Sequence, residues 1–151
     1  NNPLTATWYQ RKSRTETGRN YLTILKNNTY NYFRNIAQTS SSENMYTTFK
    51  DYRKYVRAVG YAKGFVSCNA KATNDFRNKT TLAYLINLYP YPQLIQFFEM
   101  NGVELNQDLY AISELLQWIW RSAIRDGKSI NLYLPSMRMR ELLGKWVLGK
   151  I

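Results

Sequence analysis

Apolar side chains in the first quarter of the chain recur at helical spacing. From residue 17 to residue 37 they return every three or four positions, which predicts a helix that packs one aromatic stripe against a core. The positions in this stripe are Leu22, Leu25, Thr29, Tyr32 and Phe33. The serine- and threonine-rich run at 39–42 interrupts the pattern, so we expect a short linker there.

After the linker, extended and helical patterns alternate along the chain. The strand at 80–86 is apolar almost throughout, which is typical of a parallel sheet covered on both faces. Strands separated by helices favour βαβ units, whose ligands bind beyond the carboxyl ends of the strands. We therefore predict an α/β fold with a parallel sheet flanked by helices. The expected strands are 44–48, 64–68, 80–86 and 129–134, and the expected helices are 48–58, 93–99, 108–125 and 136–147.

The chain is expected to form one sheet domain with an extension. A chain of 151 residues has the length of a single compact domain. Residues 1–42 are predicted to form a basic helical extension and linker, and residues 43–151 the α/β domain. Because the chain begins without Met, in what reads as structured sequence, we expect it to be part of a longer protein.

Charge and composition narrow the classes of function. The formal charge of +11, from 21 Lys and Arg against 10 Asp and Glu, indicates a polyanionic partner, and a basic surface kept for solubility is the alternative. The absence of histidine excludes His-based triads and His-ligated zinc, and the single Cys68 cannot form an intrachain disulfide. One cysteine and no long apolar run predict a cytoplasmic protein without a membrane partner.

The predicted helix 108–125 holds the strongest candidates for chemistry. Gln117, Arg121 and Arg125 are four residues apart, which would place a glutamine and two arginines on one stripe of that helix. Two guanidinium groups repel each other unless an anion lies between them, and the planar fork of Arg matches phosphate. A solvated charged face, or a salt bridge to a nearby carboxylate, is the alternative.

This stretch resembles motif VI of superfamily-two helicases, in which a Gln and two Arg line the cleft between two RecA-like domains. Here Arg125 follows Gln117 by eight residues instead of seven, and Trp120 replaces the Gly that commonly precedes the first arginine. Segment 46–50 resembles motif IV of the same family, and segment 69–75 resembles motif V. The resemblance places Thr47, Thr48, Lys50, Thr73 and Asn74 on nucleic acid, and Asp75, Gln117 and Arg121 near the nucleotide.

The resemblance covers roughly 43–147 and implies the second RecA-like domain of a nucleic-acid motor, similar to helicase-type replication proteins of phages and mobile elements. No Gly-x-x-x-x-Gly-Lys followed by Ser or Thr occurs in the chain. ATP with Mg²⁺ would therefore be held mainly by an N-terminal P-loop domain of the same protein. Arg121 and Arg125, with Gln117, would be catalytic residues that reach the phosphates across the cleft, so this chain alone would not hydrolyse ATP.

Three functions follow from these expectations. The leading one is the second motor domain of an ATP-dependent helicase or translocase that acts on DNA in preference to RNA. The second is a non-catalytic basic adaptor on a degenerate RecA-like scaffold, binding nucleic acid or a protein partner through the Arg-, Lys- and Tyr-rich region at 8–34. The third, a carboxylate-dependent nuclease, has little support, because no acidic pair has a spacing that would share a metal.

Two remaining groups of residues are expected to be structural or to assist binding. Trp118 and Trp146 are expected to pack in a core or between domains. Arg138 and Arg140, near the start of the last predicted helix, either extend a phosphate-binding edge or lie on a solvated face.

Overall fold

The parallel sheet predicted from the sequence is present and has three strands. The computed structural model describes residues 2–69 and 76–151. Strands β1 (Asn44–Thr47), β2 (Thr81–Tyr84) and β3 (Asn131–Tyr133) are hydrogen-bonded in the order β1-β2-β3, and both pairs are parallel. The α/β fold class is therefore confirmed, while the RecA-like identity stays a prediction.

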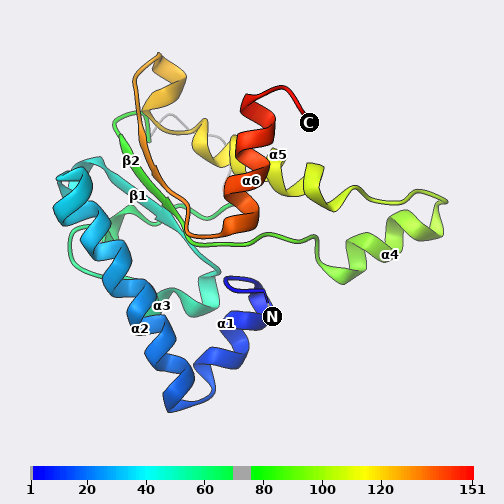
Figure 1. Ribbon diagram of the computed structural model, residues 1–151, viewed down its shortest axis with the longest axis horizontal. Coiled ribbons are helices and arrows are strands. Elements are labelled where there is room, and N and C mark those ends of the chain that lie inside the picture. Colours follow the sequence, from blue (N-terminus) through cyan, green and yellow to red (C-terminus); the bar gives the residue numbers. More distant parts are fainter. Residues whose placement is uncertain (1, 70–75) are drawn as a thin grey trace.

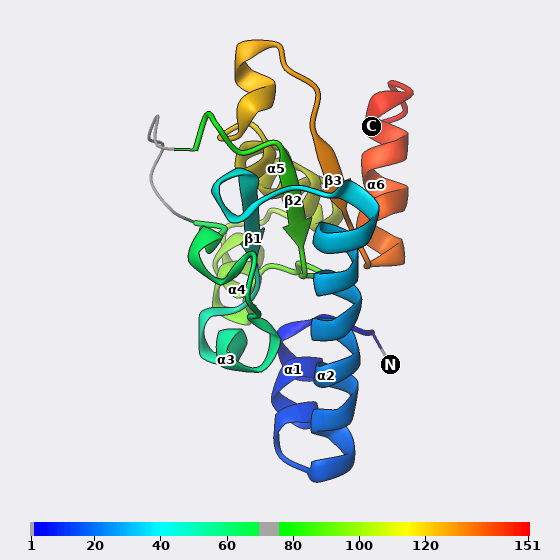
Figure 2. The ribbon, with the colours of Figure 1, turned by 90° about the vertical axis from the view of Figure 1, so that its left-hand side faces the viewer.

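Helices cover both faces of this sheet. Their bounds are α1 Ala6–Ser13, α2 Glu16–Asn31, α3 Arg53–Val56, α4 Pro92–Met100, α5 Gln107–Ile119 and α6 Met137–Val147. A π-helix continues α2 over Tyr32–Ala37, and 3-10 turns occupy Ser41–Glu43, Lys50–Tyr52, Ala62–Gly64 and Ala123–Asp126. Helices α1, α2 and α3 pack against one face and α5 and α6 against the other (Figure 1 and Figure 2).

Strand β2 lies at the centre of the core because its side chains are buried on both faces. Leu82 and Tyr84 pack toward α5 and α6, whereas Ala83 and Leu85 pack toward α1 and α2. Successive side chains of a strand point to opposite faces, so an uninterrupted apolar run is what a sheet covered on both sides requires. Full burial of each large apolar side chain contributes about 1.5–3 kcal/mol to the stability of the fold, so this strand makes a large contribution to the core.

Helix α1 is the element that the apolar pattern does not predict. Its two buried residues, Trp8 and Tyr9, are adjacent in sequence, so eight residues show no helical spacing. The helix begins where the Thr5 hydroxyl accepts a hydrogen bond from the Trp8 amide at 3.2 Å. Gly18 lets α2 approach α1 closely, because a Cβ at this position would lie 2.2 Å from the Lys12 carbonyl oxygen. The residues of the predicted extension therefore share one core with the sheet.

Two predicted elements are much shorter than expected. The strand predicted at 64–68 is wrong as a strand, because only Phe65 forms a bridge, which is parallel, to Tyr46 on the outer side of β1. The helix predicted at 48–58 is reduced to one 3-10 turn followed by the four residues of α3. A Cβ at Gly64 would lie 2.1 Å from the Asn44 carbonyl oxygen, so this segment meets β1 by backbone contact instead of side-chain packing.

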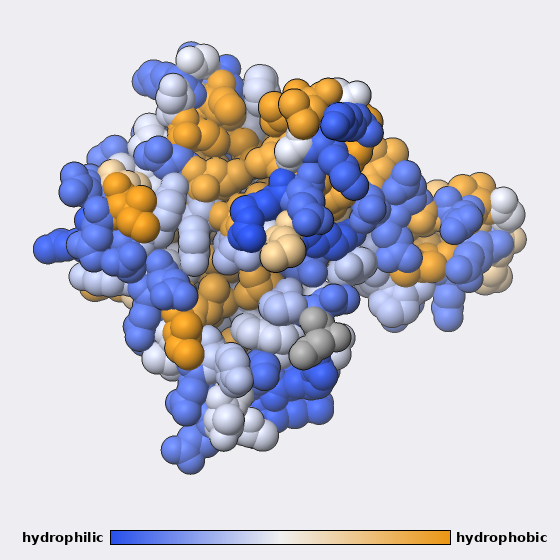
Figure 3. Space-filling model, viewed as in Figure 1, coloured by the Kyte–Doolittle hydropathy of each residue, from blue (hydrophilic) through white to orange (hydrophobic). Residues whose placement is uncertain are grey.

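The segment between β2 and α5 forms an arm. Helix α4 projects away from the rest of the chain, as Figure 1 shows, and none of its residues is buried. Exposed Phe97 and Met100 give this arm an apolar surface, which is visible as orange patches on the right of Figure 3. The helix at 93–99 is thus confirmed, although its apolar side chains do not join the core.

Candidate nucleic-acid interface

The positive charge is concentrated on one helical layer. Residues 1–63 contain 11 Lys and Arg against 3 Asp and Glu, a net charge of +8, whereas residues 64–151 contain 10 against 7, a net charge of +3. The first group comprises α1, α2, α3 and β1, so its exposed cations lie mainly on the helices that cover one face of the sheet. We call the exposed sides of α1, α2 and α3 the basic layer. Helices α1 and α2 occupy the lower part of Figure 3, where hydrophilic side chains dominate the surface.

The cations of the basic layer are available to an external anion. Within the described residues, the two ion pairs are Arg77 with Asp126 and Arg138 with Asp108, both outside the basic layer. Lys12 instead lies 3.9 Å above the ring centroid of Tyr21, which is half exposed. Basic and aromatic side chains on one surface are the combination that binds a phosphate backbone and stacks against bases.

Two of the predicted nucleic-acid contacts are buried. Thr47 and Thr48, at the end of β1, have exposed fractions of 0% and 2%. In this conformation both side chains are out of reach of a nucleic-acid backbone, so their contact with nucleic acid stays a prediction that would require α1 or the neighbouring loop to move. Lys50 follows them in a 3-10 turn and is exposed, so among these three residues it is the one that can reach a nucleic-acid strand. Thr73, Asn74 and Asp75 lie outside the described residues.

The predicted stripe of Gln117, Arg121 and Arg125 is not formed on one helix. Helix α5 ends at Ile119, and the chain turns before the 3-10 helix that contains Arg125. The Ser122 hydroxyl donates to the Ile119 carbonyl at 2.6 Å and occupies one of the last helical acceptors. Sequence periodicity continues through the break, because Ala123 still faces the core, and for this reason it did not reveal the helix end.

The three residues nevertheless line one pocket, located at the amino ends of the strands. The Ala123 amide donates to the carbonyl of Lys79, two residues before β2 begins, which places this region at the edge opposite to the one predicted. The pocket has a volume of about 760 Å³. Its apolar lining consists of Leu116, Ile119, Trp120, Ile124, Ile130, Leu132, Leu143, Trp146 and Val147.

This pocket does not fit a triphosphate. Nine of its twelve lining residues are apolar, and its charged atoms come from Arg121 and Arg125 alone. Arg121 Nη1 is buried and has no hydrogen-bond partner among the described residues, while Arg125 has other interactions. Phosphate recognition requires several convergent donors, whereas most of this surface offers none. ATP, Mg²⁺ and the N-terminal P-loop domain stay predictions from the resemblance.

Tyr9 fills the position where a sheet of this type usually binds its ligand. The chain leaves β1 for Phe65, which bridges to the outer side of β1, and later returns to β2 on the other side, so its connections diverge on the two sides of β1. Tyr9 of α1 is completely buried there, and its hydroxyl donates to the Leu85 carbonyl at 2.7 Å. Burial raises the pKa of Tyr9 well above its ordinary value of 10, so this phenol stays protonated. Helix α1 therefore closes the crevice that ligands enter in open α/β sheets.

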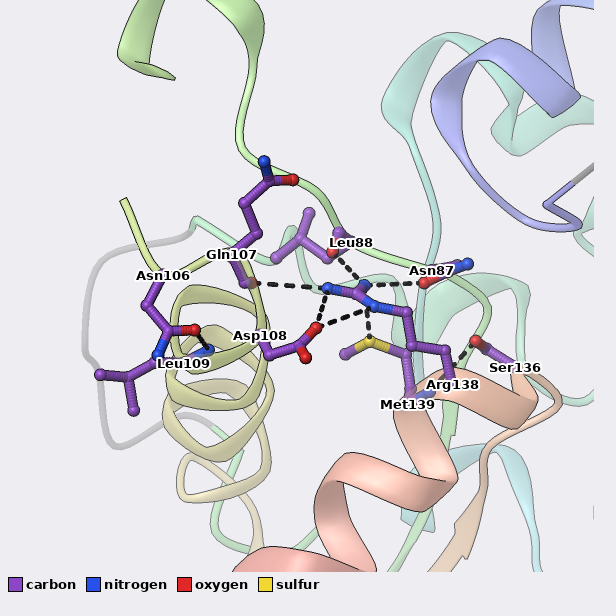
Figure 4. Close-up of polar contacts among 9 residues, drawn as sticks. All are labelled: Asn87, Leu88, Asn106, Gln107, Asp108, Leu109, Ser136, Arg138 and Met139. Carbon is purple, nitrogen blue, oxygen red and sulfur yellow. Dashed lines mark hydrogen bonds and ion pairs between the residues drawn. The ribbon is translucent and has the colours of Figure 1, made fainter. Parts of the chain in front are cut away.

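Arg138 is the most densely hydrogen-bonded side chain at the carboxyl edge of the sheet (Figure 4). Its Nη1 donates to Asn87 Oδ1 at 2.9 Å and to the Leu88 carbonyl at 2.6 Å. Its Nε and Nη2 donate to Asp108 at 3.3 and 3.0 Å, and its guanidinium lies 3.8 Å above the ring centroid of Tyr89. Arg138 thereby joins the start of α6 to the segment after β2 and to the start of α5. The sequence suggested a basic edge here, but the acceptors are non-local and could not be read from it.

The remaining candidate groups do not form a catalytic centre. Trp118 is fully buried and donates to the Val66 carbonyl at 2.8 Å, which confirms its core role, whereas Trp146 is 47% exposed. Burial, reinforced by Glu114, raises the pKa of Cys68, so its thiol is a weak nucleophile. Across 2–69 and 76–151, no three His, Cys, Asp or Glu side chains are grouped to hold a metal ion. In the same ranges no helix is long and apolar enough to cross a membrane.

A parallel sheet with helices on both faces, and with connections that diverge on the two sides of β1, is typical of a Rossmann-like α/β domain. The chain belongs to the family of the YonV C-terminal Rossmann-like domain, whose model matches residues 1–147. It is similar to the SPbeta prophage-derived uncharacterized protein YonV of Bacillus subtilis (strain 168), with 48% identity over 123 residues. This alignment covers 82% of the chain and 30% of the relative, so the chain spans less than a third of that protein. No solved structure shows significant similarity to the chain.

Proposed function

We propose that this domain is a nucleic-acid-binding module that holds DNA on the basic layer. The observation that supports this most strongly is the uneven charge, with a net +8 on the residues that build one helical layer and its strand. A surface of this kind attracts phosphates over distances of about a Debye length and gains affinity by releasing their counterions. DNA is chosen over RNA because the YonV relative is prophage-derived and because of the resemblance to phage replication proteins.

The basic layer has the features that a strand requires. Arg14 and Arg19 at the α1–α2 turn are exposed, as are Lys54 and Arg57 at α3. Tyr21 and Tyr30 on α2 are exposed by 51% and 36%, and Lys12 lies over the Tyr21 ring. Cations spaced along a surface hold the backbone, while exposed rings accept bases without regard to sequence. This arrangement favours binding with little sequence preference.

The motor function would need more than this surface. It requires Gln117 and Arg121 to face a nucleotide held by another domain, and in this chain they line a pocket that is mostly apolar. The motor therefore stays a prediction, and its test is ATP hydrolysis by the longer protein with Arg121→Ala. DNA binding by the basic layer does not depend on that outcome.

Fluorescence anisotropy with a labelled DNA strand tests the proposal. One variant carries Arg14→Gln, Lys26→Gln and Arg57→Gln in the basic layer. The matched control carries Lys128→Gln, Lys145→Gln and Lys150→Gln, which removes the same charge from exposed positions outside the basic layer. We expect the affinity of the first variant for DNA to fall about tenfold or more. The slope of log K against log salt concentration should decrease in magnitude by about 2, since each lost phosphate contact on a single strand removes about 0.7 from it.

The control should lose less than about threefold, because its cations lie away from the bound strand. Equal losses in the two variants would mean that net charge, and not this surface, attracts DNA. Absence of binding by the unmodified domain at low salt would remove the proposal altogether. Melting temperatures of both variants show whether the fold is retained.

A further inference from the structure

A pocket of about 710 Å³ opens at the carboxyl end of β2, beside α1. Its polar and aromatic lining includes Thr5, Arg11, Asn87, Tyr89, Tyr91 and Tyr110. This volume lies within the range of pockets that hold small ligands. We propose that the pocket receives one unstacked nucleobase of a DNA strand whose backbone lies on the basic layer. The proposal deepens the function proposed above and rests on it.

Two prolines restrict the backbone of the segment that carries two of the tyrosine rings in the pocket. Tyr89 and Tyr91 each precede a proline, Pro90 and Pro92, and a residue before proline is held in an extended conformation. Tyr91 has φ −68° and ψ 152°, as this restriction requires. Both rings line the pocket. The backbone that carries them is therefore restricted before any ligand arrives, which lowers the entropic cost of stacking a base.

The two rings have different freedom. Tyr89 is held by the guanidinium of Arg138, which lies 3.8 Å from its ring centroid. Tyr91 is 57% exposed and begins the arm that carries α4. An exposed ring beside a fixed one provides a face on which a base can stack without disturbing the core. Tyr91 is thus the residue whose loss reports on stacking and not on folding.

Asn87 supplies a hydrogen-bonding edge. It is 5% exposed and lines the pocket. Its Oδ1 accepts from Arg138 Nη1 at 2.9 Å, which turns the amide nitrogen away from the guanidinium, as Figure 4 shows. The two N–H donors of this amide match the acceptor that every base presents on its pairing edge, which is a carbonyl oxygen in guanine, cytosine and thymine and a ring nitrogen in adenine. Those acceptors are occupied in a duplex and free in a single strand, so the pocket favours single-stranded DNA.

Arg11 connects this pocket to the basic layer. It lines the pocket and also a smaller groove, of about 280 Å³, formed with Lys12, Thr15, Gly18 and Tyr21 between α1 and α2. A guanidinium at this junction can hold the phosphate beside the inserted base through two parallel hydrogen bonds. The strand would therefore run from the α1–α2 groove past Arg11, with one base entering the pocket.

The test compares two strands of about 12 nucleotides, one of thymidine and one of abasic spacers with the same phosphates. We expect the domain to bind the thymidine strand about tenfold more tightly at equal salt. Tyr91→Ala should remove most of this preference and leave the affinity for the abasic strand unchanged, and Tyr91→Phe should retain it. Phe97→Ala, which removes an exposed ring of α4 outside both the pocket and the basic layer, should leave the preference intact.

The outcomes separate the two proposals. If neither strand binds at low salt, the proposed function itself has failed. If both bind equally well, or if Phe97→Ala lowers the preference as much as Tyr91→Ala does, phosphate binding stands and the pocket assignment is overturned. If thymidine monophosphate displaces the thymidine strand at a concentration comparable to that of the strand, the pocket is a site for free nucleotides, and the proposal of an inserted base is likewise overturned. A duplex that binds as tightly as the single strand in a Tyr91-dependent manner contradicts the need for an unstacked base.

Discussion

Replacing Arg138 by Met should destabilise the domain far more than removing its ionic partner. Met fills a similar length but donates no hydrogen bond, so Asn87 Oδ1 and the carbonyl of Leu88 lose their charged donor. Loss of a charged donor to a part-buried acceptor costs about 1.5–3 kcal/mol. The cation over the Tyr89 ring adds about 0.5–1 kcal/mol, whereas the bond to the 60% exposed Asp108 adds at most about 1 kcal/mol.

Because the two acceptors are only part-buried and water can partly replace the donor, we expect a total of about 3 kcal/mol for Arg138→Met. For a domain of 151 residues this corresponds to a fall in Tm of about 6–12 °C. Asp108→Asn serves as the control, since it keeps the acceptor and removes only the charge, and should cost less than about 1 kcal/mol. Urea unfolding followed by tryptophan fluorescence measures both variants.

A difference of less than about 1 kcal/mol between the two variants would contradict this expectation. In that case the hydrogen bonds to the segment after β2 would contribute nothing beyond a surface ion pair. Arg138→Lys separates charge from geometry, because Lys keeps the cation but cannot reach acceptors on three sides at once. We expect it to fall between the other two variants.

Two further predictions concern the N-terminal helical layer. The free energy of unfolding should be nearly constant from pH 8 to 10 and then decrease. The pKa of Tyr9 is higher in the folded protein than in the unfolded one, so the stabilising contribution of its protonated hydroxyl is lost as the pH rises through the folded-state pKa. Denaturation at pH 8 to 11 should show a smaller decrease for Tyr9→Phe, and equal slopes would contradict this role of Tyr9. Gly18→Ala should lower the free energy of unfolding by about 1–3 kcal/mol, since its Cβ would meet the backbone of Lys12. Gly144→Ala in α6 should be neutral or stabilising, because a Cβ there meets nothing within 4 Å. Similar effects of the two substitutions on Tm would show that α1 and α2 separate easily.

Helices with several well-spaced apolar residues could be predicted from the sequence, and helices without them could not. The stripe that includes Leu22 and Leu25 predicts α2, and the run around Leu82 predicts a strand buried on both faces, because each pattern repeats over enough residues to identify its period. Helix α1 shows no such pattern, since it contacts the core only through Trp8 and Tyr9. Its position depends on contacts with the segment at β2, which lies more than seventy residues away in sequence, as the hydrogen bond from Tyr9 to Leu85 shows.

The candidate site was predicted less well than the fold, for a related reason. Gln117, Arg121 and Arg125 were expected together and do line one pocket, but helix α5 ends between the first two, and the pocket lies at the amino edge of the sheet. Spacing along a chain indicates which side chains share a helix face only while the helix continues. It carries no information about the direction in which that helix crosses the sheet.

The sequence by itself determined the α/β class, the location of most helices and the excess of positive charge, because these depend on local periodicity and on composition. Only the tertiary structure decided that α1 closes the crevice between β1 and β2 and that Arg138 fixes Asn87 beside an aromatic pocket. Those arrangements join residues separated by about fifty positions or more, and their geometry depends on how whole elements pack against the sheet.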